Sequence, residues 1–199
     1  VTTSGVGVAD HVVRDDGLAP NDVLLVTGEV GRHGVALLAE REGIEFGTTL
    51  ESDVRPINSV VNEALSAANG GVTAMKDPTR MGLAGAASEM AKKSGVGIEL
   101  RQERIPVSAD VKGASVMLGL NPLQIANEGI ALLGVDPTVA EDVLAALRSH
   151  PDGTDAGAGH GPSTAGADDE PGSRDRTTGG DPGQGVSETA DGSAESDAE

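Results

Sequence analysis

Residues 75–83, Met-Lys-Asp-Pro-Thr-Arg-Met-Gly-Leu, combine charged, hydroxyl and glycine residues in one short turn. They run from an apolar segment into a helical pattern, and a strand-to-helix corner can direct backbone N–H groups at an anion. The guanidinium of Arg80 can also form paired hydrogen bonds with phosphate oxygens. We therefore expect a phosphate or metal-nucleotide contact from four residues of this turn: Asp77, Thr79, Arg80 and Gly82. A purely structural interpretation is equally good, with Asp77 as helix cap and Pro78 as the first helical residue.

A second candidate is Asn127-Glu128-Gly129, which directly precedes an apolar strand pattern at 130–135. A carboxylate at a strand edge beside a glycine can reach into a cleft as a general base or a metal ligand. We therefore take Glu128 as the candidate catalytic residue and Asn127 as a candidate cofactor contact. The simpler alternative is that Glu128 is an exposed residue of a turn.

The segment Gly28–Gly34 contains three glycines and His33, again between an apolar run and a helical pattern. Glycines at such a transition allow the backbone to approach a ligand closely. The spacing fits neither the dinucleotide-binding nor the P-loop pattern, so the nucleotide signal is weak. His33 is a candidate cofactor contact, although a capping or surface role is the more common one for a single histidine.

Several classes of function are disfavoured by the composition. The chain has no cysteine and its four histidines lack ligand spacing, so we expect no metal site. A net charge of −18 argues against nucleic-acid binding and against an anionic membrane. There is no long apolar run and no signal peptide, which favours a cytoplasmic location. The acidity suggests a halophilic source, or simply an acidic soluble protein.

The elements that would position these residues alternate along the chain. Apolar periodicity, glycine stops and capping residues predict strands and helices in mixed order. The strands are expected at 5–13, 23–27, 72–75, 96–100 and 130–135. The helices are expected up to 42, at 56–69, 80–93 and 108–118, and from 136 onward. This alternation predicts a layered α/β domain with helices packed on a mixed sheet.

The chain divides by composition near residue 150. Residues 151–199 hold twelve Asp and Glu, two Arg and only one large aliphatic residue. Such a segment cannot bury enough apolar surface to offset its ordering entropy. We therefore expect an α/β domain at 1–150 and a disordered acidic tail at 151–199. Because the apolar alternation begins almost at Val1, we expect the chain to start inside a larger parent protein.

The motifs together resemble the carboxy-terminal half of the HypE family of hydrogenase maturation factors. The resemblance lies in the order and content of four stretches, 23–34, 37–43, 77–84 and 121–129, which include Asp-Pro-Thr-Arg and Ala-Asn-Glu-Gly. This family belongs to the superfamily of aminoimidazole ribonucleotide synthetase and selenophosphate synthetase. The resemblance covers roughly residues 1–150 and implies that superfamily's carboxy-terminal α/β fold.

The resemblance also implies an activity. Members of the family use ATP to dehydrate a carbamoyl group on a carboxy-terminal cysteine, giving a thiocyanate that supplies the cyanide ligands of the nickel–iron centre. ATP with Mg²⁺ would be bound mostly by an amino-terminal half, which also forms the dimer. The resemblance also implies partner proteins of the HypF, HypC and HypD types. Glu128 would be the base, and the turn at 77–82 would line the cleft.

The chain departs from the family in three respects. The amino-terminal half is absent, Met81 stands where the family has a glycine, and the cysteine-ended tail is replaced by the acidic segment. That segment is either a halophilic extension or the product of a shifted reading frame. The isolated chain is therefore expected to be inactive. The alternatives are another ATP-dependent synthetase of the superfamily, or a non-catalytic interaction remnant.

Overall fold

The computed structural model describes residues 2, 4–9, 11–44, 50–159 and 164–165. Its strands are β1 (Val23–Val26), β2 (Val72–Lys76), β3 (Val96–Gly97), β4 (Leu132–Val135), β5 (Gly157–Ala158) and β6 (Thr164–Ala165). Its α-helices are α1 (Arg32–Glu42), α2 (Asn58–Ala68), α3 (Gly82–Ser94), α4 (Ala109–Leu118) and α5 (Ala140–Ser149). Three short 3₁₀ turns occupy Gln102–Arg104, Pro122–Gln124 and Pro151–Gly153.

The main sheet has the strand order β2-β4-β1-β5, and every pair in it is antiparallel. The prediction of a mixed sheet is therefore wrong, because adjacent strands in the sheet run in opposite directions throughout. The central strands are apolar on both faces. Leu24 and Val26 of β1 contribute to one core cluster, while Leu25 contributes to the other. This alternation explains why β1 reads as a continuous apolar run.

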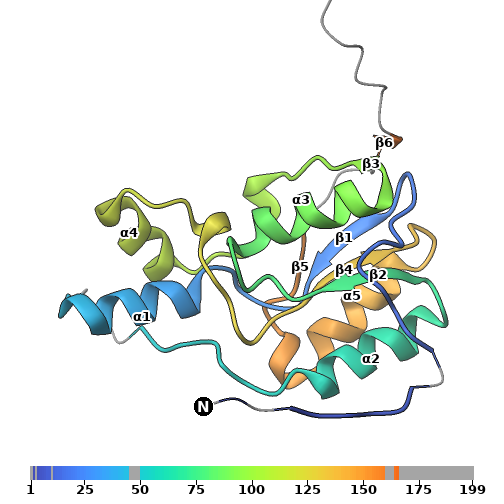
Figure 1. Cartoon of the computed structure of the whole chain (residues 1–199), viewed down its shortest axis with the longest axis horizontal. Coiled ribbons are helices and arrows are strands. Elements are labelled where there is room, and N and C mark those ends of the chain that lie inside the picture. The colour runs from blue at the N-terminus through green and yellow to red at the C-terminus, as the bar shows by residue number, and fades with distance from the viewer. Residues whose placement is uncertain (1, 3, 10, 45–49, 160–163, 166–199) are drawn as a thin grey trace, which may run out of the picture. The chain divides into compact units, whose positions relative to one another are not determined.

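Helices cover both faces of this sheet (Figure 1). On one face, α2 and α5 pack around the cluster that contains Leu25, with Val60, Ala64 and Leu147 fully buried. On the other face, α3 buries Leu83 and Met90 against β1 and β4. The pair α1 and α4 lies to one side of the sheet and has its own small core of Val35, Val111 and Ala114. The layered α/β architecture is thus confirmed.

Most helix ends predicted from glycine stops and capping residues are confirmed. Gly43 and Gly95 end α1 and α3 with left-handed φ values of 64° and 69°, as glycine stops do. Ser108 caps α4 by accepting a hydrogen bond from the Val111 N–H. Helix α5, however, begins at Ala140 rather than at Asp136. The Asp136 carboxylate accepts the Thr138 N–H over 2.8 Å and so caps a turn that precedes the helix.

Both ends of the body differ from expectation. Within 4–9 and 11–13 there is no strand. Val13 packs against the core cluster beside the sheet, and the Arg14 carbonyl accepts the Met75 N–H. At the other end, β5 pairs with β1 beyond the expected boundary at residue 150. Small residues allow this, because a side chain at Gly157 would collide with Pro106. The remainder of the acidic tail lies outside the described residues, apart from β6. Among the described helices, none is long and apolar enough to cross a membrane.

Candidate functional site

Three loops carrying the predicted residues meet at one edge of the sheet. We call them loop A (Gly28–Gly34, which includes the first residues of α1), loop B (Asp77–Gly82, which ends at the first residue of α3) and loop C (Ile125–Gly129). Strands β1 and β2 both pair antiparallel with β4, which lies between them. The carboxyl ends of β1 and β2 therefore lie at the same sheet edge as the amino end of β4. Loops A and B leave the sheet at this edge, and loop C enters there.

Asn127 joins all three loops. Its side-chain oxygen accepts the N–H of Gly31 in loop A over 2.6 Å. Its side-chain nitrogen donates to the carbonyls of Pro78 in loop B, at 3.1 Å, and Ile125 in loop C, at 3.0 Å. The residue is 1% exposed, so these bonds form out of contact with water. Asn127 thus makes three side-chain hydrogen bonds to the protein's own backbone.

Two glycines allow the loops to approach one another closely. A Cβ on Gly82 would lie 2.5 Å from the Ile125 carbonyl oxygen, and Gly82 also has a φ of +61°. A Cβ on Gly34 would collide with Ile125 as well, and the Gly34 N–H donates to the Ala126 carbonyl over 3.1 Å. The space beside Gly82 is therefore filled by loop C. This gives Gly82 a packing role in addition to the predicted cofactor contact.

The other predicted residues of loop B are more open. Asp77 and Arg80 are exposed and Thr79 is half-buried. No ion pair of the described residues involves Arg80. The alternative in which Asp77 caps the helix is wrong, because α3 begins only at Gly82 and receives no side-chain cap. Loop B therefore presents a guanidinium beside the uncapped amino end of a 13-residue helix.

Met81 ends loop B in a strained conformation. Its φ is 57° and its ψ 17°, in the left-handed region that glycine adopts without cost. Its side chain is 73% exposed. The backbone here therefore keeps the shape expected for a glycine although the residue is methionine.

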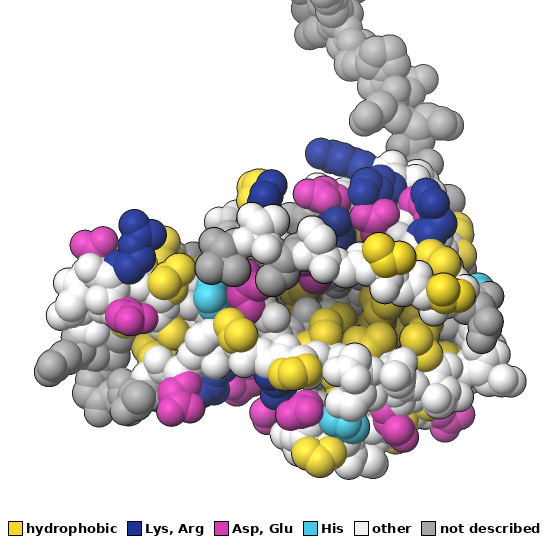
Figure 2. Space-filling view, turned by 60° about the horizontal axis from the view of Figure 1, so that its bottom comes forward, with side chains coloured by type: hydrophobic (Ala, Val, Ile, Leu, Met, Phe, Trp, Pro, Cys, Tyr) yellow, Lys and Arg dark blue, Asp and Glu magenta, His cyan; other side chains and the backbone are white. Residues whose placement is uncertain are grey.

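A groove of about 530 Å³ borders loop B. It is mostly apolar, with Ile57, Val61 and Met75 in its lining and Asp77 and Lys76 among the polar lining residues. Figure 2 shows apolar side chains gathered in a central hollow of one molecular face, with charged side chains around it. Asp77 thus lies where an apolar surface meets the charged turn.

A segment that the sequence analysis did not single out is tied to loop C and to α1. We call Glu51–Arg55 the strap. The Asp53 carboxylate accepts the N–H groups of Glu128, at 3.3 Å, and of Gly129, at 3.2 Å. The Arg55 Nε donates to the Gly129 carbonyl over 3.1 Å. The strap thus pairs with the loop that carries Glu128, whose own side chain is exposed.

The strap is also bonded to α1, through the predicted residue His33. The His33 Nδ1 and the Ser52 Oγ lie 2.9 Å apart, and the Arg32 Nε donates to the Glu51 carbonyl over 3.3 Å. His33 is therefore half-buried against the strap rather than free at the sheet edge. Its role as a cofactor contact stays a prediction.

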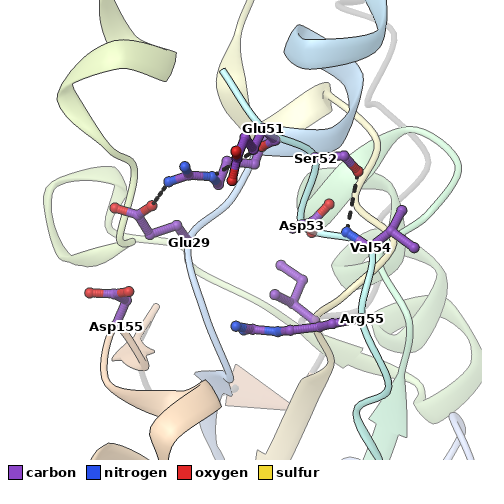
Figure 3. A pocket seen from close by; sticks show the side chains of 9 residues that line it. Glu29, Glu51, Ser52, Asp53, Val54, Arg55 and Asp155 are labelled. Atoms are coloured by element: carbon purple, nitrogen blue, oxygen red, sulfur yellow. Dashed lines mark hydrogen bonds and ion pairs between the residues drawn. The ribbon is translucent and has the colours of Figure 1, made fainter. Parts of the chain in front are cut away.

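A polar cavity of about 200 Å³ lies between the strap and loop A (Figure 3). Arg55 extends from the strap into it, facing the side that carries Glu29 and Asp155. Glu29 is paired with Arg32 over 2.8 Å. Within the described residues, no group of three or more acidic, histidine or cysteine side chains could hold a metal ion. The cavity is thus a charged hollow without the donor set of a metal centre.

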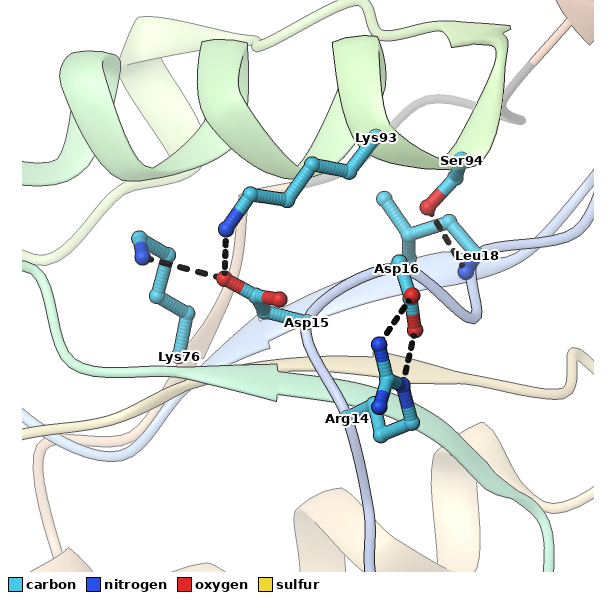
Figure 4. A network of polar contacts seen from close by, with 7 residues as sticks. All are labelled: Arg14, Asp15, Asp16, Leu18, Lys76, Lys93 and Ser94. Carbon is cyan, nitrogen blue, oxygen red and sulfur yellow. Dashed lines mark hydrogen bonds and ion pairs between the residues drawn. The ribbon is translucent and has the colours of Figure 1, made fainter.

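A second polar cluster connects the segment before β1 with β2 and α3 (Figure 4). Asp15 lies between Lys93, at 2.6 Å, and Lys76, at 3.2 Å. The hydrogen bonds from Lys93 and then Lys76 lower the pKa of Asp15. The Lys76 amine also contacts Glu89, and this hydrogen bond is the main cause of its raised pKa. This surface network fastens the segment before β1 to the sheet and to α3.

The predicted residues are thus brought to one sheet edge, but in different ways. Asp77, Thr79, Arg80 and Glu128 are at least partly exposed, whereas Asn127 and Gly82 are engaged within the fold. Asp53 and Arg55 were missed. Their only local signal is that two charged residues, separated by Val54, precede Pro56. This pattern indicates no specific function until the fold places both residues beside Gly129.

Comparisons with known proteins identify the family of the chain. Residues 19–157 match the family described as AIR synthase related protein, C-terminal domain. The carbamoyl dehydratase HypE of Cupriavidus necator is 41% identical over 158 residues, which are 78% of this chain and 45% of the relative. The carbamoyl dehydratase HypE of Rhizobium leguminosarum is 38% identical, with the same 78% of this chain and 45% of the relative. The chain therefore spans about half the length of the curated relatives it matches.

Solved structures give the same result. A crystal structure of a HypE–HypF complex aligns with a TM-score of 0.74 and 34% identity, over 77% of this chain and 50% of the matched chain. A hydrogenase maturation protein HypE in complex with ATP aligns with a TM-score of 0.71 and 32% identity, over 79% of this chain and 46% of that chain. The match of family, sequence and fold shows that the chain belongs to the AIR synthase related family and carries its carboxy-terminal domain in the form found in HypE.

Proposed function

We propose that this chain is the carboxy-terminal half of an ATP-dependent carbamoyl dehydratase of hydrogenase maturation. One observation carries the proposal: Asn127 joins three loops from distant parts of the sequence at one edge of the sheet. Two of these loops present the exposed charged residues Arg80 and Glu128. The relatives named carbamoyl dehydratase HypE support the reaction type.

The chemistry of loop B fits a nucleotide phosphate. When bound, ATP supplies the phosphoryl group that makes the oxygen of an amide a leaving group. Arg80 is free of ion pairs within the described residues and can form hydrogen bonds to phosphate oxygens. Thr79 and Asp77 lie beside it, so that hydroxyl and carboxylate groups can order a nucleotide and its Mg²⁺. Most nucleotide contacts are assigned to an amino-terminal half that this sequence does not include.

Glu128 is proposed as the base. Dehydration of an S-carbamoyl group converts –S–CO–NH₂ into –S–C≡N. Both protons must leave the nitrogen, and the oxygen leaves with the phosphoryl group that ATP supplies. A carboxylate within hydrogen-bond reach of the nitrogen can accept one proton at a time, releasing the first to solvent before it takes the second. Glu128 is exposed at the sheet edge, where a substrate can approach it from solvent.

The proposal requires groups outside this sequence. The 199 residues hold no cysteine, so the cysteine that carries the carbamoyl group lies outside them. The solved HypE–HypF complex supports a partner of the HypF type, and partners of the HypC and HypD types are further proposals. Dimerisation through the amino-terminal half is also proposed, on the same family resemblance.

The test is reconstitution in solution. The chain is mixed with the separately produced amino-terminal half of the Cupriavidus necator relative, ATP, Mg²⁺ and a synthetic peptide that carries S-carbamoyl-cysteine. We expect the mixture to bind ATP and to convert the peptide to its thiocyanate, detected by mass spectrometry as loss of water. The chain alone is expected to hydrolyse no ATP.

Glu128→Gln separates catalysis from folding in this assay. The variant should lose thiocyanate formation but keep the thermal midpoint of the native chain, because the side chain is exposed. Glu63→Gln, which changes an exposed carboxylate of α2, is the matched control and should remain active. A fully active Glu128→Gln variant would remove Glu128 from the reaction, and absence of ATP binding in the mixture would contradict the domain assignment.

A further inference from the structure

The strap contacts the backbone of the residue proposed as the base. The Asp53 carboxylate accepts the N–H of Glu128 through both of its oxygens and the N–H of Gly129 through one. Two successive backbone N–H groups of loop C thus donate to one carboxylate. This carboxylate belongs to a residue 75 positions before Glu128 in the sequence.

The fit between the two segments leaves little room for movement. A Cβ on Gly129 would collide with the Asp53 carbonyl, so the strap backbone lies directly against loop C. The Arg55 Nε donates to the Gly129 carbonyl. Loop C is thus bonded to the strap through both the N–H and the carbonyl of Gly129. These bonds lie two residues after Asn127, which joins loop C to loops A and B.

The strap is in turn anchored to α1. Its first two residues contact Arg32 and His33 through the Glu51 carbonyl and the Ser52 hydroxyl. Asp53 is therefore held on one side by α1 and on the other by loop C. A carboxylate held in this way fixes the position of the Glu128 backbone N–H, and therefore the position of the Cα atom from which the Glu128 side chain extends.

From these contacts we infer that Asp53 is a positioning residue for Glu128 in the proposed dehydration. This inference rests on the proposed function of Glu128. Asp53 does not touch the substrate; it acts through the two N–H groups that it accepts. Small displacements of a reacting group reduce rates strongly, so the loss of these bonds should affect turnover more than ATP binding.

The kinetic test uses the reconstituted mixture described above. Asp53→Ala removes all three bonds and should lower kcat by about tenfold or more, with the KM for ATP changed by less than about twofold. Asp53→Asn keeps one acceptor oxygen and should give an intermediate kcat. Glu63→Gln serves again as the control, with an unchanged kcat. A wild-type kcat in Asp53→Ala would overturn the inference.

A double variant separates this inference from the proposed function. If Asp53 acts through Glu128, Asp53→Ala should cause no further loss of the residual single-turnover rate that is left in a Glu128→Gln background. An equal additional loss in that background would show that Asp53 acts through another group and would overturn the inference while leaving Glu128 in place. Full activity of Glu128→Gln alone would remove the proposed base and the inference with it.

A measurement on the chain alone provides a readout independent of activity. Amide hydrogen exchange of Glu128 and Gly129 should accelerate in Asp53→Ala and less so in Asp53→Asn, while amides of the central strand β4 stay protected. Unchanged exchange at both amides in Asp53→Ala would overturn the inference, because the carboxylate would then not be what holds them.

Discussion

The joint at Asn127 and the ion-pair network at Asp15 both connect distant segments, but they do so by different physics. Asn127 is a neutral amide buried among backbone groups. If one of its hydrogen bonds is lost, water does not reach the buried partner to replace it. Asp15 is charged and remains 27% exposed between two lysines. Exposed ion pairs add little to stability, because water already solvates both partners. The buried joint should therefore dominate the stability of the sheet edge.

The largest expected effect is at the buried joint. Asn127→Ala leaves the Gly31 N–H and the Ile125 carbonyl without their side-chain partner, and each unsatisfied buried group costs about 1–3 kcal/mol. We expect the free energy of unfolding to fall by about 2–4 kcal/mol in urea titrations.

Asn121→Ala is the matched control for this variant. Asn121 is exposed, and among the residues that the structure describes its side chain accepts only the Leu123 N–H, at the start of a 3₁₀ turn. Its removal should cost about 1 kcal/mol or less. Similar losses in the two variants would contradict the distinction between the buried joint and an ordinary surface cap.

A smaller effect of opposite sign is expected at Met81, in loop B beside the joint. Met81→Gly relieves a left-handed backbone that costs about 1–2 kcal/mol for a residue with a side chain, although glycine adds entropy to the unfolded chain. The net stabilisation should be about 0.5–1 kcal/mol, measured by thermal unfolding. Met117→Gly, at an equally exposed methionine inside α4, should instead destabilise by a similar amount. Destabilisation by both variants would show that φ at Met81 carries no strain.

The smallest effect is expected in the ion-pair network. The lysines lower the folded-state pKa of Asp15, so this carboxylate adds stability above its unfolded pKa of about 3.9 and loses it as pH falls through the folded pKa. Asp15→Asn should therefore cost less than about 1 kcal/mol at pH 7 and nothing at pH 2. About 1 M salt should also shrink the difference, because it screens exposed charges. A loss that persists at low pH would mean that the contact is not ionic.

The helices were largely predictable because their signals are local. Helix α2 could be recognised from apolar residues at helical spacing after Pro56, and α1 from its glycine stop at Gly43. The start of α5 was misplaced because Asp136 and Pro137 form a valid capping pattern that the chain uses for a turn instead. The prediction of a strand at 5–13 was also wrong within 5–9 and 11–13. Alternation of apolar residues does not by itself provide a neighbouring strand with which the segment can form hydrogen bonds.

The candidate site was only partly predictable. Glycine-rich and charged turns indicated loops A, B and C. Their content and their order along the chain resembled those of a known family. That Asn127 turns inward while Glu128 remains exposed follows from hydrogen bonds to Gly31 and Pro78, which no local pattern contains. Asp53 was missed for the same reason, because its partners lie 75 and 76 residues away.

By itself, the sequence determined the helix-forming segments, the apolar central strands and the abrupt change to an acidic composition, because each depends on neighbouring residues. The tertiary structure alone decided that the sheet is antiparallel, that the strap lies against loop C, and that Met81 adopts a glycine-like backbone. These features depend on pairing between distant segments, such as the Ala131 N–H and the Thr27 hydroxyl, which lie 104 residues apart. Such pairs form only when the whole core closes around them, so their identity is a property of the packed fold.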